Sequence, residues 1–161
     1  MTMKGFTLIE TLVAVTVLTL AVAGPFNALR GALVNSYIAR DQLVATSLAQ
    51  EGIEYIRSVR DANYLGGSSW LTGLGSCTPG PCVVDTAFGT ISGTVQPLRL
   101  STGGLYSYVS SSGDKVSVYT RTVSITALAG GTEAKVTSSV SWITRGVTYT
   151  TTLTENIRDW L

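Results

Sequence analysis

The chain contains no histidine, and this absence excludes several kinds of enzyme site. Histidine is the side chain that most often acts as a general base, and without it two cysteines alone cannot supply a tetrahedral zinc site. The sequence also has no phosphate-binding loop, nucleophile elbow or dinucleotide fingerprint. We therefore expect a protein that is not an enzyme and that uses no metal or other cofactor.

Charged side chains are scarce and balanced in sign. They make up 13% of the residues, with eleven Lys and Arg against ten Asp and Glu. No basic stripe is present, so we expect no nucleic-acid binding by this chain alone. The carboxylates of Asp85, Asp114 and Glu133 fall at expected turns, where we expect them to be solvated. Ser and Thr together supply about a quarter of the residues, which is typical of an exported protein rich in β-structure.

One long segment near the amino terminus carries no charge. The nineteen residues from Thr11 to Leu29 are mostly apolar. As a helix they would rise ~28 Å, close to the ~30 Å thickness of the hydrocarbon core of a bilayer. Glu10 directly precedes this segment, and a carboxylate there is costly unless it is paired or neutralised. A segment that served only as an anchor would not need it.

The residues around Glu10 match a known pattern. The stretch 4–18, KGFTLIETLVAVTVL, resembles the amino-terminal signature of type IV prepilins and pseudopilins. The resemblance implies that a membrane peptidase cuts between Gly5 and Phe6 and that Phe6 is then N-methylated. It also implies that Glu10 guides the assembly of subunits.

A physical role for Glu10 agrees with this resemblance. Cleavage would create an ammonium group on Phe6, and Glu10 of one subunit could pair with that group on its neighbour. Such pairing would neutralise two buried charges and fix the axial register of the helices. The simpler interpretation is that Glu10 lies at headgroup depth, where the helix dipole favours an anion.

Two other interpretations of the amino terminus remain open. A conventional secretory signal would be cut after the small-x-small sequence 21–23, Ala-Val-Ala. An uncut signal anchor would keep Lys4 on the cytoplasmic side. A Glu at the start of the apolar core is unusual for a secretory signal.

The resemblance implies a structural subunit of a type IV pilus, or of a pilus-like filament of type II secretion or competence. It implies a single-pass protein of the bacterial inner (cytoplasmic) membrane, with the carboxy-terminal domain outside, which then enters an extracytoplasmic filament. The implied partners are other pilin subunits and the prepilin peptidase and methyltransferase. Major pilin, minor pilin and pseudopilin all fit, and the short leader favours the last two. The alternative function is a membrane-tethered or secreted adhesin or binding module.

The resemblance and the distribution of apolar residues together divide the chain into four parts. These are a leader (1–5), a transmembrane and filament-core helix (6–29), an amphipathic continuation of that helix (30–65), and a connector with a carboxy-terminal β-sheet (66–161). Gly24-Pro25 predicts a kink in the helix, because proline lacks the N–H that would bond the preceding turn.

The continuation of the helix carries an apolar stripe at spacings of three, four and seven. The stripe consists of Val34, Ile38, Ala45, Leu48, Gly52, Ile56 and Val59. The segment 45–65 also resembles the corresponding region of minor pilins and pseudopilins, although an ordinary amphipathic core helix explains the same pattern. We expect the helix to run from Phe6 to about Asp61.

The two cysteines flank a turn. Cys77 and Cys82 enclose Thr-Pro-Gly-Pro, and Pro79-Gly80 can bring the two cysteines within disulfide range. A chain that leaves the cytoplasm favours a disulfide. Free thiols and a metal or redox site are the alternatives.

The remainder predicts an antiparallel sheet of four or five strands, so that the fold class is α+β. The expected strands are 90–100, 105–109, 116–128 with a bulge near Tyr119, a strand through Val136 to Trp142, and a strand from Val147 to Leu153. Arg145-Gly146 predicts the last hairpin. Aromatic residues could line a binding surface, but we expect them in the core or on the sheet: Trp70, Tyr106, Tyr108, Tyr119 and Trp142.

Overall fold

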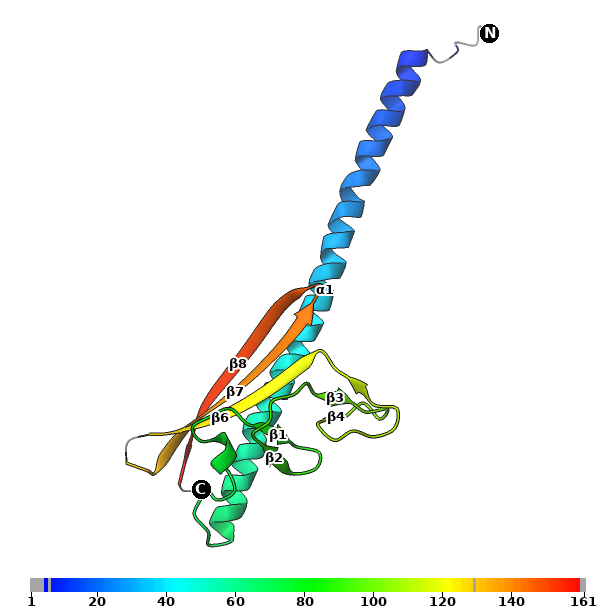
Figure 1. Ribbon diagram of the computed structural model, residues 1–161. Helices are drawn as coiled ribbons and strands as arrows, with labels where there is room; N and C mark the ends of the chain where they lie inside the picture. Colours follow the sequence, from blue (N-terminus) through cyan, green and yellow to red (C-terminus); the bar gives the residue numbers. More distant parts are fainter. Residues whose placement is uncertain (1–4, 6, 129, 160–161) are drawn as a thin grey trace. The chain divides into compact units, whose positions relative to one another are not determined.

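A computed structural model describes residues 5, 7–128 and 130–159 of the chain. The chain divides into two compact units, residues 1–41 and 42–161. A single long helix, α1 (Leu8–Leu65), contributes to both units (Figure 1). The remaining elements all belong to the second unit, and together they confirm the α+β class.

Helix α1 confirms the long amino-terminal helix and extends four residues beyond the expected end at Asp61. The predicted start at Phe6 lies outside the described residues. Gly24 and Pro25 both lie inside α1, and the expected kink at this pair stays a prediction. After Leu65 the chain leaves the helix through a turn in which Gly67 has a φ of 68°.

In the second unit, α1 buries the central part of the predicted apolar stripe. Ala45, Leu48, Gly52 and Ile56 are buried, as expected. Ala49 and Ile53 are also buried, which widens the stripe to the width of a helix face that packs on a sheet. Val59, at the end of the predicted stripe, is only partly buried against the core.

The main sheet is an antiparallel meander in the order β6-β7-β8 (Figure 1). Its strands are β6 (Tyr119–Ala127), β7 (Glu133–Thr144) and β8 (Val147–Arg158). The predicted hairpin between β7 and β8 is confirmed. Arg145 and Gly146 both have positive φ, 53° and 79°, as a two-residue hairpin turn matched to the twist of its strands requires.

Five shorter strands form two further sheets. One sheet pairs β1 (Val83–Asp85) with β2 (Thr90–Ser92). The other has the order β4-β3-β5, in which β4 is Tyr106–Ser107, β3 is Arg99–Leu100 and β5 is Lys115–Val116.

The structure divides two of the predicted strands. The segment 90–100 forms β2 and β3 rather than one strand, because Gly93 and Pro97 lie between them and proline cannot donate to a ladder. The segment 116–128 breaks at Ser117 and Val118, where a bulge was expected. The Ser117 amide instead donates to the Leu98 carbonyl oxygen at 2.8 Å, and β6 begins at Tyr119.

The predicted disulfide between Cys77 and Cys82 is confirmed, with the two Cα atoms 4.7 Å apart. A short 3-10 helix, η1 (Gly75–Cys77), leads into it. Both cysteines are fully buried. The amide and the carbonyl of Cys82 each bond to Val123 of β6 at 2.8 Å, so the disulfide loop lies against the outer edge of the main sheet.

The core of the second unit consists of two apolar clusters between α1 and the main sheet. One lies towards the carboxyl end of α1 and includes Ile53, Ile56, Trp70, Leu74, both cysteines, Val84, Val123, Ile125, Val136 and Ile157. The other includes Ala45, Leu48, Ala49, Leu98, Tyr119, Val140 and Trp142.

Gly52 sets the distance between α1 and the main sheet. A Cβ atom at this position would lie 2.9 Å from the Ser138 Oγ and 3.2 Å from the Val123 Cγ2. We expect Gly52→Ala to lower the free energy of unfolding by about 1–3 kcal/mol, because the added methyl group overpacks this contact. Urea unfolding followed by tryptophan fluorescence measures the change.

Ser138 provides the matched control. Its buried Oγ has no hydrogen-bond partner among the described atoms, so Ser138→Ala should cost little. The double variant should recover part of the stability that Gly52→Ala loses. Equal stability of Gly52→Ala and the unaltered protein would contradict the close contact.

Candidate functional site: the amino-terminal segment

Helix α1 begins with a capping arrangement that includes Glu10. The Thr7 hydroxyl accepts the Glu10 amide at 3.3 Å, and the Thr7 carbonyl accepts the amides of Glu10 and Thr11 at 3.1 and 3.2 Å. Thr-x-x-Glu is the sequence of a capping box, in which the first side chain satisfies an amide of the first helical turn. The bonds to Thr7 come from the Glu10 amide, so they fix the start of the helix at this residue and leave its carboxylate to another role.

The apolar side chains that follow Glu10 are exposed. The described part of α1 from Leu8 to Leu33 has no buried residue, and Leu8 and Leu20 are 83% and 76% exposed. The helix contains an 18-residue window with a mean hydropathy of 2.0, long and apolar enough to cross a membrane. An exposed apolar surface of this extent is typical of a segment that contacts lipid or another protein.

Three threonine hydroxyls in this segment bond to the backbone of the helix itself. The hydroxyls of Thr11, Thr16 and Thr19 each donate to the carbonyl three residues earlier, at 2.8–2.9 Å. A threonine bonded in this way presents mainly its methyl group outward. The segment therefore keeps its apolar surface despite its threonines, and the Glu10 carboxylate is the one acidic group of its first turn.

Of the two predicted processing residues, the structure describes only Gly5. Gly5 is exposed and precedes the helix. Phe6, the predicted site of N-methylation, lies outside the described residues. Cleavage between Gly5 and Phe6 and the assembly role of Glu10 are therefore predictions that the structure does not test.

The aromatic residues considered as a binding surface belong to the core instead. Trp70, Tyr119 and Trp142 are between 3% and 7% exposed. Tyr106 contacts Tyr119 edge-on with ring centroids 5.8 Å apart, and Tyr149 stacks on Trp142 at 5.7 Å. The prediction that these side chains pack in the core is confirmed, and Trp70 offers no exposed ring to a ligand.

A buried arginine links three elements of the second unit. The Arg121 side chain, on β6, has no exposed surface. Its guanidinium donates to the Leu48 carbonyl of α1 at 3.0 Å and to the Val84 carbonyl of β1 at 2.6 Å. It also forms an ion pair with Glu51 at 3.4 Å. The sequence gives no local signal for this contact, because its partners lie 37 to 73 positions away.

Asp85, which follows Val84 in β1, is buried, contrary to the expectation of a solvated turn residue. It is only 2% exposed, and its carboxylate accepts the amides of Ala87, Phe88 and Tyr108 at 2.7–3.3 Å. Burial, with a smaller contribution from the charge of Asp85, raises the pKa of the Tyr108 phenol. These bonds show that Asp85 orders the loop between β1 and β2 and joins it to β4.

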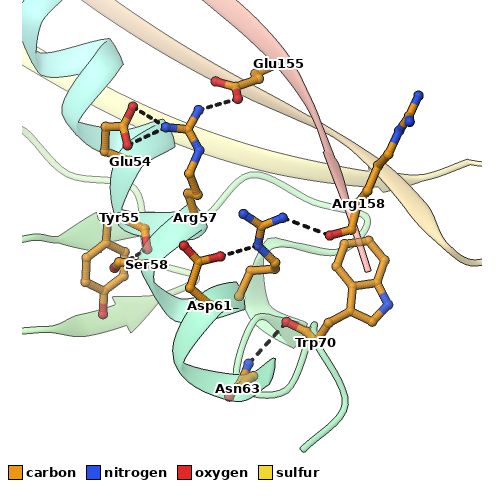
Figure 2. Close-up of polar contacts among 10 residues, drawn as sticks. Glu54, Tyr55, Arg57, Ser58, Asp61, Asn63, Trp70, Glu155 and Arg158 are labelled. Carbon is orange, nitrogen blue, oxygen red and sulfur yellow. Dashed lines mark hydrogen bonds and ion pairs between the residues drawn. The ribbon is translucent and has the colours of Figure 1, made fainter. Parts of the chain in front are cut away.

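Ionic and polar contacts hold the carboxyl-terminal turns of α1 against β8 (Figure 2). Arg57 bonds to Glu54 at 2.7 Å and also to Glu155 of β8. Hydrogen bonding to Glu155 raises the pKa of Arg57 further above its usual value. Within the described residues, no cluster of three or more His, Cys, Asp and Glu side chains could hold a metal ion.

Comparison with known proteins supports the importance of the amino-terminal segment. Residues 1–24 match the family model described as the prokaryotic N-terminal methylation motif. No curated protein and no solved structure matches the chain. The chain therefore carries the type IV pilin signature at its amino terminus, the mark of a prepilin-peptidase substrate. The motif and the apolar helix together indicate membrane anchoring.

Proposed function

We propose that this protein is a structural subunit of a type IV pilus or of a pilus-like filament, processed at Gly5 and assembled through α1. The observation that carries the proposal is the methylation motif over residues 1–24, followed by an apolar helix with no buried residue as far as Leu33. The apolar side chains of this helix must be kept from water, and in a filament they would pack against neighbouring copies of the same helix.

In this proposal, cleavage switches the chain from storage to assembly. The uncut chain is held in the inner membrane by residues 6–29, with the second unit outside. After cleavage, the new ammonium group of Phe6 pairs with Glu10 of a neighbouring subunit. Pairing removes the cost of placing two separate charges in an apolar environment. The methylated terminus and Glu10 then set the register of the packed helices.

We further propose that the chain performs no chemistry of its own. Its partners would be other pilin subunits, together with the prepilin peptidase and methyltransferase that process it. Major pilin, minor pilin and pseudopilin roles all agree with this mechanism. The buried position of Trp70 removes one feature that favoured a tethered binding module.

Gly5→Leu tests the processing step. We expect the variant to insert in the membrane but to stay at its uncut mass, because the peptidase must approach the backbone closely at the residue before the cut. Gly31→Leu, a glycine within α1 with open space around it, is the matched control and should be cut normally. Immunoblotting of membrane fractions with and without the peptidase separates the two forms. Normal maturation of Gly5→Leu would show that the junction lies elsewhere.

A further inference from the structure

Strand β8 forms an open edge of the main sheet. It has β7 as its neighbour and, among the described residues, no other strand on its far side. Its twelve residues pair with β7 without interruption, and it contains no proline, glycine or lysine. Natural edge strands usually carry such residues or a bulge to prevent pairing with another chain. The first eight residues of β8, from Val147 to Thr154, carry no charge at all.

The opposite edge of the sheet is covered. Cys82 bonds to Val123 through both its amide and its carbonyl, and the Leu98 amide donates to the Tyr119 carbonyl at 2.8 Å. An added strand therefore finds its backbone donors and acceptors at β8. Because the β6 edge is already bonded, β8 of one copy cannot pair with β6 of the next to form a continuous sheet.

A groove runs beside β8 on the face that packs against α1. It is lined by Gln50, Ile53 and Glu54 of α1 and by Leu153, Thr154 and Glu155 of β8. Two carboxylates, Glu54 and Glu155, share the single guanidinium of Arg57. The groove therefore combines an apolar wall with one negative charge in excess, and it suits an apolar side chain followed by a cation.

The start of β8 supplies those two groups. Arg145, in the hairpin turn, is exposed, and Val147 is 53% exposed. Val147 lies on the same face of the sheet as Leu153 and Glu155, because alternate residues of a strand share a face. Tyr149 on this face stacks on the buried Trp142.

We propose that β8 pairs antiparallel with β8 of a second copy of this chain, about a twofold axis at Thr150. In this register Val147 of each copy lies opposite Leu153 of the other, and Arg145 lies opposite Glu155. Each groove then receives a valine and an arginine from the partner. Thr148 lies opposite Thr152, a favourable cross-strand pair of hydroxyl side chains.

The pairing goes beyond the proposed filament function and does not depend on it. A twofold contact is closed, because both copies use the same surface and leave none free. It therefore joins two subunits rather than propagating along a filament. Subunits of two neighbouring filaments that run in opposite directions could meet in this way.

Cysteine cross-linking of the full-length protein in detergent micelles tests the register. Directly opposite residues have Cα atoms about 4.5–5.5 Å apart, within the range of a disulfide. Thr150→Cys should therefore cross-link to its own copy under mild oxidation. The native cysteines do not interfere, because they are buried and already paired.

Thr154→Cys is the matched control. Thr154 lies on the same face of the same strand as Thr150, and both side chains are exposed. In the proposed register its two copies are eight residues apart along the strand, or roughly 27 Å. We expect the dimer band on a non-reducing gel to form at least tenfold faster for Thr150→Cys. Adding Arg145→Gln to Thr150→Cys should slow it severalfold. Equal rates for the two cysteine variants, or no dimer from Thr150→Cys, would overturn the proposal.

Discussion

Glu10→Gln is expected to leave the chain inserted and processed but to reduce its incorporation into filaments by at least tenfold. The substitution removes the carboxylate that would neutralise the Phe6 ammonium of a neighbouring subunit. Glutamine can still occupy the third position of a capping box, so the start of α1 should be preserved. The loss would therefore report the charge and not the cap. Subunits in sheared filaments and in membranes, compared by immunoblotting, give the measurement.

Thr7→Val is the converse variant. It removes the hydroxyl that accepts the Glu10 amide but leaves the carboxylate in place. Loss of such a cap costs roughly 1 kcal/mol of helix stability, which is small beside an unpaired charge in an apolar environment. We expect near-normal incorporation of this variant. If Glu10→Gln assembled normally while Thr7→Val did not, Glu10 would act as a capping residue and the pairing mechanism would be wrong.

Arg121→Met is expected to cause the largest loss of stability in the second unit, about 3 kcal/mol or more. The substitution leaves the Leu48 and Val84 carbonyls without a charged donor in a fully buried site. Hydrogen bonds to charged groups contribute about 1.5–3 kcal/mol each, and an unsatisfied buried partner adds to the loss. The midpoint of urea unfolding, followed by tryptophan fluorescence, should fall accordingly.

Glu51→Gln separates the ion pair from the carbonyl contacts. The Glu51 side chain is 40% exposed, and an ion pair that is partly open to water contributes about 1 kcal/mol or less. We expect this variant to lose much less stability than Arg121→Met. Comparable losses for the two variants would show that the ion pair, rather than the bonds to α1 and β1, holds Arg121 in place.

The helix and the last hairpin could be predicted from the sequence because their signals are local. The uncharged run from Thr11 to Leu29 and the spacing of Ala45, Leu48 and Ile56 determine where a helix is stable and which face it buries. Arg145-Gly146 likewise determines its turn through positive φ angles that only a few residues adopt readily.

The polar core of the second unit could not be predicted in this way. Arg121 lies in phase with the apolar residues Val123 and Ile125 of β6, so the alternation places a charged side chain on the buried face, and it is fully buried. What stabilises it there is the position of the Leu48 and Val84 carbonyls, which only the folded chain brings together. The burial of Asp85 has the same origin, since its third bond comes from the Tyr108 amide across the fold.

The candidate site was recognised from sequence in its chemistry but not in its local structure. The sequence singles out Glu10 because this charged residue directly precedes the uncharged run from Thr11 to Leu29. Thr7, three residues earlier, accepts the Glu10 amide, and Thr-x-x-Glu is a local sequence signal for this helix start. The interpretation of the carboxylate therefore depends on comparing variants that separate its charge from its hydrogen bonding.

The mass and the amino-terminal sequence of the mature protein test the central claim most directly. Mass spectrometry of the native polypeptide, purified from membranes or filaments, should find a chain that begins with an N-methylated Phe6. A chain that begins at Gly24 would indicate a secretory signal, and one that keeps residues 1–5 would indicate an uncut anchor. Either result would contradict the account, because Glu10 would then have no neighbouring Phe6 ammonium group with which to pair.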